Sequence, residues 1–238
     1  MRLRSPYDRE ILALAFPALG ALAAGPLYTL VDTAIVGHLG VRQLAGLALA
    51  GTLLTALVEV ADFLSYGATA QVARLRGGGE DAQAGEVIAQ ALWLSLGMGL
   101  LCVVVVLAGG GPLLSLLGRG AGVHGRAQLY LRIVALGLPA QLLALAAEGC
   151  LRGLGDLRTP LRILVVANGA NVVLEVALVY GAGLGLAGSA IGTLIAQLGM
   201  GAAFARRLLA VPGSRRRPDL ARMRPLGVGR DGGGWAGR

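Results

Sequence analysis

Long apolar stretches alternate with short polar connections over most of the chain. A membrane-spanning helix needs about 20 predominantly apolar residues. Six stretches approach or exceed that length: Ile11–Gly37, Leu44–Ala73, Ile88–Gly109, Leu129–Leu151, Leu161–Tyr180 and Leu184–Ala205. Connections such as GHLGVRQ and YGAGLGL are short, so consecutive helices are expected to be antiparallel neighbours. The pattern predicts an all-α integral membrane protein built as a bundle of six transmembrane helices.

The composition favours a membrane protein over a soluble one. Of the 238 residues, 55% are hydrophobic and only 14% are charged, whereas a typical soluble domain is about 25% charged. All 21 basic residues are arginine. The absence of lysine from the sequence excludes a Schiff-base lysine and the lysine of a phosphate-binding P-loop, so an ATP-driven pump is not expected in this chain.

The arginines predict how the helices are oriented. With the N-terminus in the cytoplasm, 17 arginines face inward, in agreement with the positive-inside rule. Four face outward: Arg42, Arg119, Arg126 and Arg132. We therefore expect a multi-pass protein of the cell membrane with both termini cytoplasmic. Residues 1–10 then form the cytoplasmic N-terminus, residues 11–210 the bundle, and residues 211–238 a basic tail that faces lipid rather than nucleic acid.

Five carboxylates interrupt the apolar segments: Asp32, Glu59, Asp62, Glu148 and Glu175. A charge at a helix centre costs about 2.5–3.5 kcal/mol on insertion scales, so these side chains should face a bundle interior or a watery cavity. Removal from water favours the protonated form when no cation is near. Such acids could exchange protons near neutral pH, as a proton-coupled transporter requires. In the alternative interpretation they stay neutral and form structural hydrogen bonds between helices.

Helical spacing collects the polar residues on single faces of three segments. The three stripes are Thr55, Glu59, Asp62 and Tyr66; Asn168, Asn171 and Glu175; and Ser189, Thr193 and Gln197. Polar stripes on apolar helices indicate a shared interior, which is either a cavity or a seam of interhelical hydrogen bonds; we favour the cavity. Glu148 differs, because Arg152 four residues later predicts a structural ion pair.

The residues give no sign of an enzyme. The two cysteines, Cys102 and Cys150, and the two histidines, His38 and His124, lie in separate segments. This spacing matches neither a zinc site nor a nucleophile with its base. We therefore expect no catalytic activity, no metal site and no cofactor.

Four motifs together resemble the multidrug and toxic compound extrusion (MATE) family, and in particular its DinF-like branch. They are VDTAIVGHLG, FLSYGATAQVAR, LRGLGDLRTPL and NVVLEVALVYGAGLGLAGSAIGT, in this order, and the likeness runs from about Ile11 to Arg230. The resemblance implies a secondary antiporter that expels organic cations or amphipathic compounds in exchange for H⁺ or Na⁺. It also implies two six-helix lobes that face each other across a central cleft.

The resemblance assigns roles to individual residues. The acid of the family's VDT motif corresponds to Asp32, and an Asn followed four residues later by Asp corresponds to Asn171 and Glu175, where Glu replaces Asp. These three are the expected ion-coupling residues. The expected cavity-lining residues are Tyr28, Glu59, Asp62, Tyr66, Asn168 and Gln197, of which Glu59 and Asp62 depart from the apolar or amide residues usual there. A structural motif is expected at the cytoplasmic turn: Arg152, Gly153, Gly155, Asp156, Arg158, Thr159 and Pro160.

The length corresponds to only the first lobe of such a transporter. RPDLARMRPLGVGRD resembles the linker into a second lobe, but GGGWAGR is unlike a seventh helix. A frameshift or truncation would produce this ending, and the partner would then be the missing C-terminal half. Two alternatives remain: a half-size transporter that works as a homodimer, and a degenerate membrane protein that does not transport.

Overall fold

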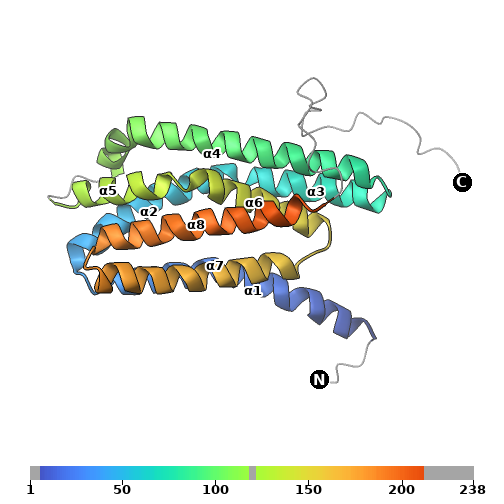
Figure 1. Ribbon diagram of the computed structural model, residues 1–238, viewed down its shortest axis with the longest axis horizontal. Coiled ribbons are helices and arrows are strands. Elements are labelled where there is room, and N and C mark those ends of the chain that lie inside the picture. Colours follow the sequence, from blue (N-terminus) through green and yellow to red (C-terminus); the bar gives the residue numbers. More distant parts are fainter. Residues whose placement is uncertain (1–5, 118–121, 212–238) are drawn as a thin grey trace, which may run out of the picture.

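The computed structural model describes residues 6–117 and 122–211, which form an elongated bundle of α-helices (Figure 1). The elements are α1 (Pro6–Gly37), α2 (Val41–Ala61), α3 (Phe63–Gly77), α4 (Asp81–Leu117), α5 (His124–Ala135), α6 (Leu138–Gly153), α7 (Arg158–Val176), the π-helical turn η1 (Ala177–Gly181) and α8 (Leu186–Leu208). Most of the predicted basic tail, the first half of the predicted N-terminal segment, and Arg119 lie outside the described residues.

The predicted all-α membrane bundle is confirmed, although two of the predicted spans are interrupted. The second is divided into α2 and α3 at Asp62, and the fourth into α5 and α6, which bend by 56° relative to each other. Within the described residues, four spans are long and apolar enough to cross a membrane, or five if the bent pair counts as one. In α1, Leu22–Gly37 forms a shorter apolar helical stretch.

The predicted bounds of the third segment were too short. Instead of ending at Gly109, α4 continues through Pro112 to Leu117. It also begins seven residues before the predicted Ile88, at Asp81. The first of these extensions contains the charged residues Asp81 and Glu86, and the second begins with glycines and Pro112, which usually end a helix.

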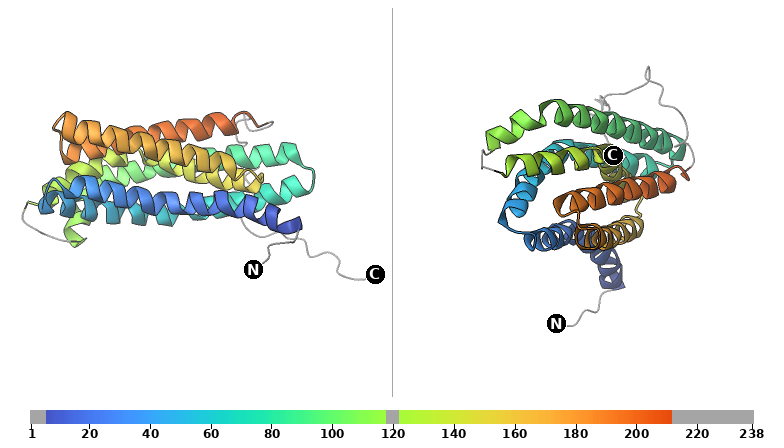
Figure 2. Two further views of the ribbon diagram at one scale, coloured as in Figure 1. Left: turned by 90° about the horizontal axis from the view of Figure 1, so that it is seen from below. Right: turned by 60° about the vertical axis from the view of Figure 1, so that its left-hand side comes forward.

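The helices run back and forth along the long axis, and sequence neighbours are not always the closest packing partners (Figures 1 and 2). α6 packs mainly against α3, α4 and α8, whereas α7 packs against α1 and α8 and hardly touches α6. The expectation that all consecutive helices are close neighbours was therefore wrong for α6 and α7. This arrangement brings α1, α7 and α8 together on one side of the bundle.

Glycines allow the closest approaches between helices. A Cβ added at Gly149 of α6 would lie 2.4 Å from the Ser65 carbonyl oxygen of α3, and one at Gly99 of α4 would lie 2.4 Å from Pro139 Cα at the start of α6. Membrane helices depend on such small residues because lipid provides no hydrophobic driving force for their association. The bundle is therefore held partly by backbone-to-backbone packing.

Gly149→Ala is expected to lower the thermal stability of the purified chain. The added methyl group overlaps the α3 backbone, and overpacking of this kind costs about 1–3 kcal/mol. Gly97→Ala is the matched control, because a Cβ at Gly97 has nothing within 4 Å. Melting curves in detergent followed by circular dichroism would compare the two. Equal melting temperatures for the two variants would contradict the close packing of α3 on α6.

Candidate functional site

Two buried carboxylates meet where α1, α7 and α8 converge. Asp32 on α1 is 6% exposed and Glu175 near the end of α7 is fully buried. Ser189 of α8 lies between them: its hydroxyl donates to Asp32 Oδ1 at 2.9 Å, and Glu175 Oε1 is a second acceptor at 3.4 Å. One hydroxyl proton can serve only one acceptor at a time, so Ser189 links the two acids without satisfying both.

Helical spacing directs these side chains to one point. Asn171 and Glu175 are four residues apart on α7, and Ser189 and Thr193 are four residues apart on α8, so each pair lies on one face of its helix. Gly192 lets the two faces approach, because a Cβ there would be 3.1 Å from Glu175 Cγ. The site therefore depends on a small residue opposite the acid.

Glu175 Oε1 is surrounded by hydrogen-bond donors. Thr193 donates to it from Oγ1 at 3.4 Å. With its amide oriented to satisfy both neighbours, Asn171 donates to the same oxygen at 3.1 Å and accepts from the Thr193 backbone N–H at 3.1 Å. The Tyr28 hydroxyl lies 3.1 Å from Thr193 Oγ1, so a chain of hydroxyl groups connects α1 to the carboxylate.

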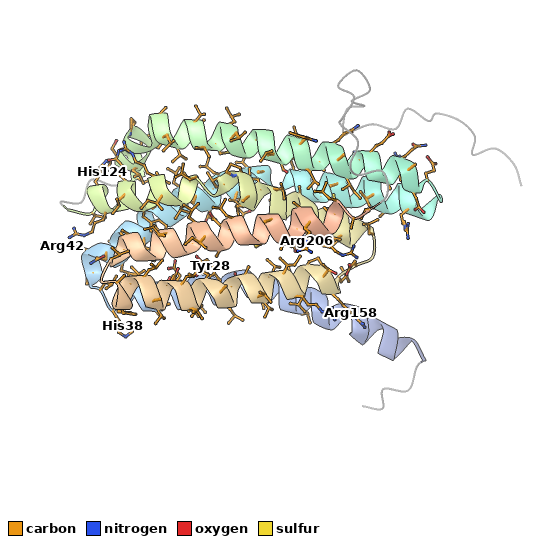
Figure 3. The ribbon with its side chains drawn as sticks, viewed as in Figure 1. Tyr28, His38, Arg42, His124, Arg158 and Arg206 are labelled. Atoms are coloured by element: carbon orange, nitrogen blue, oxygen red, sulfur yellow. The ribbon has the colours of Figure 1, made fainter. Side chains whose placement is uncertain are left out.

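No cation balances the two acids within residues 6–117 and 122–211. None of the salt bridges of these residues involves Asp32 or Glu175, and Glu175 Oε2 is buried without a hydrogen-bond partner among them. Figure 3 shows Tyr28 midway along the bundle, whereas Arg42 lies at one end and Arg158 and Arg206 lie at the other. Two unpaired negative charges at this depth are costly, so the geometry favours a bound proton or small cation.

A π-helical turn begins two residues after Glu175. In η1 the Ala182 N–H donates to the Ala177 carbonyl at 2.8 Å, and the Tyr180 hydroxyl donates to the Ile35 carbonyl of α1 at 2.7 Å. π-turns are rare and often lie at functional sites. This turn attaches the end of α7 to the end of α1 that carries Asp32.

The other predicted cavity-lining residues are distributed over the bundle. Asn168 donates to the Ala24 carbonyl at 3.3 Å and so joins α7 to α1 about two helical turns from the acids. Gln197, two turns beyond Ser189 on α8, lies against Gly137 and has a buried Oε1 without a partner in the described chain. Their contribution to a cavity stays a prediction.

Glu59, Asp62 and Tyr66 lie at the junction of α2 and α3, on different elements from the paired acids. Glu59 is exposed, Asp62 is half-buried at the break between the helices, and Tyr66 is 65% exposed. The predicted polar stripe is therefore interrupted by the change of helix. Nearby, the predicted ion pair is present: Arg152 Nη2 lies 3.0 Å from Glu148 Oε1.

The motif between α6 and α7 forms a compact turn. Asp156 accepts from the Thr159 backbone N–H at 3.0 Å and from its hydroxyl at 2.7 Å, which satisfies an N–H group at the start of α7. Arg207 of α8 donates to Asp156 at 3.2 Å. Gly155 has a φ of 78°, a backbone conformation that favours glycine, and Gly153 packs on Thr69 and Val72. Arg158 is the first residue of α7, and Pro160 is buried in its first turn.

Ser189 and Thr193 were not predicted as site residues, although both belonged to a polar stripe. The stripe indicated which face of α8 is polar, but it did not indicate which acids that face would meet. The signal that could have identified them is the Gly192 between them, which marks the point of closest approach to α7.

Comparisons with known proteins give a consistent result. The MatE family model matches residues 17–177. The chain is 32% identical to DNA damage-inducible protein F of Escherichia coli, covering 90% of this chain and 47% of that protein. It is 31% identical to Protein DETOXIFICATION 44, chloroplastic, of Arabidopsis thaliana, covering 79% of this chain and 38% of that protein.

Solved structures agree with these matches. The crystal structure of MATE in the bent conformation superposes with a TM-score of 0.80 at 26% identity, covering 87% of this chain and 46% of that one. An inward-facing conformation of a multidrug resistance MATE family transporter gives a TM-score of 0.73 at 27% identity, covering 79% of this chain and 44% of that one. The chain thus spans less than half the length of these relatives.

Asp156→Asn is expected to lower the melting temperature at pH 7, and by progressively less as the pH falls below 3.8. Burial alone would raise the pKa of the Asp156 carboxyl, but the hydrogen bonds from Thr159 and the Arg207 guanidinium outweigh burial and hold this pKa below its ordinary value of 3.8. A carboxyl group whose pKa is lower in the folded than in the unfolded chain stabilises the folded chain at pH values above its unfolded pKa. This stabilisation is lost as the pH falls through the folded pKa.

Melting curves of both proteins at a series of pH values would test this. Asp81→Asn is the control, since its ion pair with Arg76 is largely exposed and such pairs contribute little. A difference for Asp156→Asn that stayed constant down to pH 3 would show that the loss does not come from the ionised carboxylate.

Proposed function

This chain belongs to the MATE family of multidrug efflux transporters, and from that membership we propose that it supplies one six-helix lobe of a secondary antiporter. Asp32 and Glu175 bind the coupling ion, which is a proton or a sodium ion, with Asn171 and Tyr28 shaping the site. The observation that carries this proposal is the pair of buried acids linked through Ser189, without a cationic partner in the described chain.

The hydrogen-bond donors around Glu175 support different roles for its two carboxylate oxygens. Thr193 and Asn171 direct donors toward Oε1, and the Ser189 hydroxyl lies 3.4 Å from it, so this oxygen is held as an acceptor. Oε2 is buried without a partner. A proton on Oε2 would remove the charge without breaking any of these contacts, which makes Oε2 the proposed site of protonation.

Exchange then follows from competition between positive charges. In a site of low dielectric constant, a proton or sodium ion on the acids and a cationic substrate nearby repel each other strongly. Occupation by the ion therefore favours release of the substrate, and loss of the ion favours its binding. Organic cations and amphipathic compounds are the proposed substrates, and the described site does not distinguish among them.

The ion need not be a proton alone. The oxygens of Asp32, Glu175, Ser189 and Thr193 lie close together, and hard cations prefer oxygen ligands of this kind. Among the described residues, no cluster of three or more His, Cys, Asp or Glu side chains could hold a metal ion. Sodium would therefore depend on hydroxyl and amide oxygens as well as on the two acids.

A complete cleft requires a second lobe. A C-terminal lobe of a longer protein would supply it, and a second copy of this chain is the alternative. We place both termini on the cytoplasmic side, because Arg158 and Arg206 gather at one end of the bundle while Arg42 lies at the other (Figure 3).

Asp32→Asn and Glu175→Gln are each expected to abolish sodium binding by the purified chain, because each removes one of the two carboxylates that the proposal requires. Glu175→Gln should also remove the proton-binding oxygen, whereas Asp32→Asn should alter proton binding without removing that oxygen. Sodium binding can be measured with radioactive sodium, and proton binding from the infrared band of protonated carboxyl groups during a pH titration. Glu148→Gln is the control, because that acid is paired with Arg152. Unchanged sodium and proton binding in both site variants would refute the assignment.

Ser189→Ala is expected to weaken ion binding without abolishing it. The change leaves both acids in place but removes the hydroxyl between them, and a typical hydrogen bond contributes about 1 kcal/mol, or roughly a fivefold change in affinity. The same two binding assays would measure it, with Ser115→Ala as the control at an exposed hydroxyl that bonds only to its own helix. An affinity equal to that of the unmodified chain would show that Ser189 does not couple the acids.

A further inference from the structure

A separate apolar groove runs between α7 and α8. It has a volume of about 460 Å³, and small residues leave the space open: Ala167, Ala170, Ala196, Gly199 and Ala203. None of the residues that hold Asp32 and Glu175 lines it. The groove is therefore distinct from the proposed ion site, although both use the same two helices.

The groove faces outward from the bundle. Val166 is 71% exposed and Ile195, on the opposite wall, is 45% exposed. In a chain that spans a membrane, such apolar surface is suited to the hydrocarbon of the bilayer. Its length also matches lipid: Arg162 and Leu174 both line it, and twelve helical residues rise about 18 Å, close to one half of the roughly 30 Å hydrocarbon core.

One end of the groove is positively charged. Arg162 is the only charged residue in its lining. Arg158 precedes it by one turn on α7, and Arg206 follows Ala203 by one turn on α8, so three arginines gather where the antiparallel helices α7 and α8 meet. Figure 3 shows Arg158 and Arg206 at the same end of the bundle. None of the three forms a salt bridge with another described residue.

We propose that this groove binds an anionic phospholipid, with one acyl chain along the small residues of α7 and α8 and the phosphate at Arg162. Basic pockets between transmembrane helices are known to favour anionic headgroups. The combination of an apolar channel one leaflet long with a cationic end fits that ligand. It does not fit a free anion, which would leave the apolar part unoccupied. The proposal does not depend on ion coupling or transport.

Native mass spectrometry of the purified chain with equimolar phosphatidylglycerol and phosphatidylcholine tests this site. The unmodified chain is expected to retain more phosphatidylglycerol. Arg162→Ala should reduce that preference by about fivefold, and Arg162→Lys should largely restore it. Gly199→Leu should reduce retention of both lipids, because a Cβ at Gly199 has nothing within 4 Å and a larger side chain would enter the groove without displacing a helix.

Two controls match these variants. Arg42→Ala removes an exposed arginine at the other end of the bundle, and Gly97→Leu enlarges a glycine of α4 that also has open space around it. Both should bind lipid as the unmodified chain does. Equal retention of the two lipids, or an unchanged preference in Arg162→Ala, would overturn the proposal. So would a dimer that Gly199→Leu dissociates without loss of lipid, because the groove would then hold a second copy of the chain.

Discussion

The arrangement of α1, α7 and α8 depends on one interaction, the contact of two buried carboxylates with a shared hydroxyl group. Asp32 and Glu175 each lie in an apolar helix, where an acid exposed to hydrocarbon would be very costly. Bringing both to Ser189 gives each a polar neighbour. The same contact leaves one carboxylate oxygen of Glu175 without a hydrogen-bond partner in the described chain, so the interaction that joins three helices does not satisfy every polar atom it buries.

The rest of the bundle is consistent with this constraint. α3, α4 and α6 pack through glycines at short backbone distances, and the described part of that side contains a half-buried ion pair, Glu148 with Arg152. α7, in contrast, barely touches α6. The helices that carry the acids, α1 and α7, are thus joined to the rest of the bundle mainly through α8. The bundle therefore has a closely packed part, α3, α4 and α6, and a part that contains the polar site, α1, α7 and α8.

Much of this could be predicted from the sequence, because apolar length and polar spacing are local properties. The membrane bundle, the polar faces of α7 and α8, and the burial of Asp32 and Glu175 followed from them. The break at Asp62 did not, since hydropathy measures how apolar a segment is and not how its backbone runs. The bend between α5 and α6 lies beside Pro139, a residue type that can kink a helix. The bridge through Ser189 also could not be foreseen, because it depends on which helices become neighbours.

The π-turn after Glu175 has a consequence for the direction of that side chain. Tyr180, within η1, is anchored to the Ile35 carbonyl, and Glu175 lies one helical turn earlier. Each residue of an α-helix turns the chain by about 100°. A π-helical turn contains about one residue more than an α-helical turn, so η1 sets the rotation of α7 about its own axis relative to the Tyr180–Ile35 hydrogen bond. If η1 tightened into an ordinary α-helical turn, the face of α7 that carries Glu175 would turn by about 100° relative to that hydrogen bond. The π-turn thus decides which side of α7 meets Ser189, and with it whether the two acids can share one hydroxyl group.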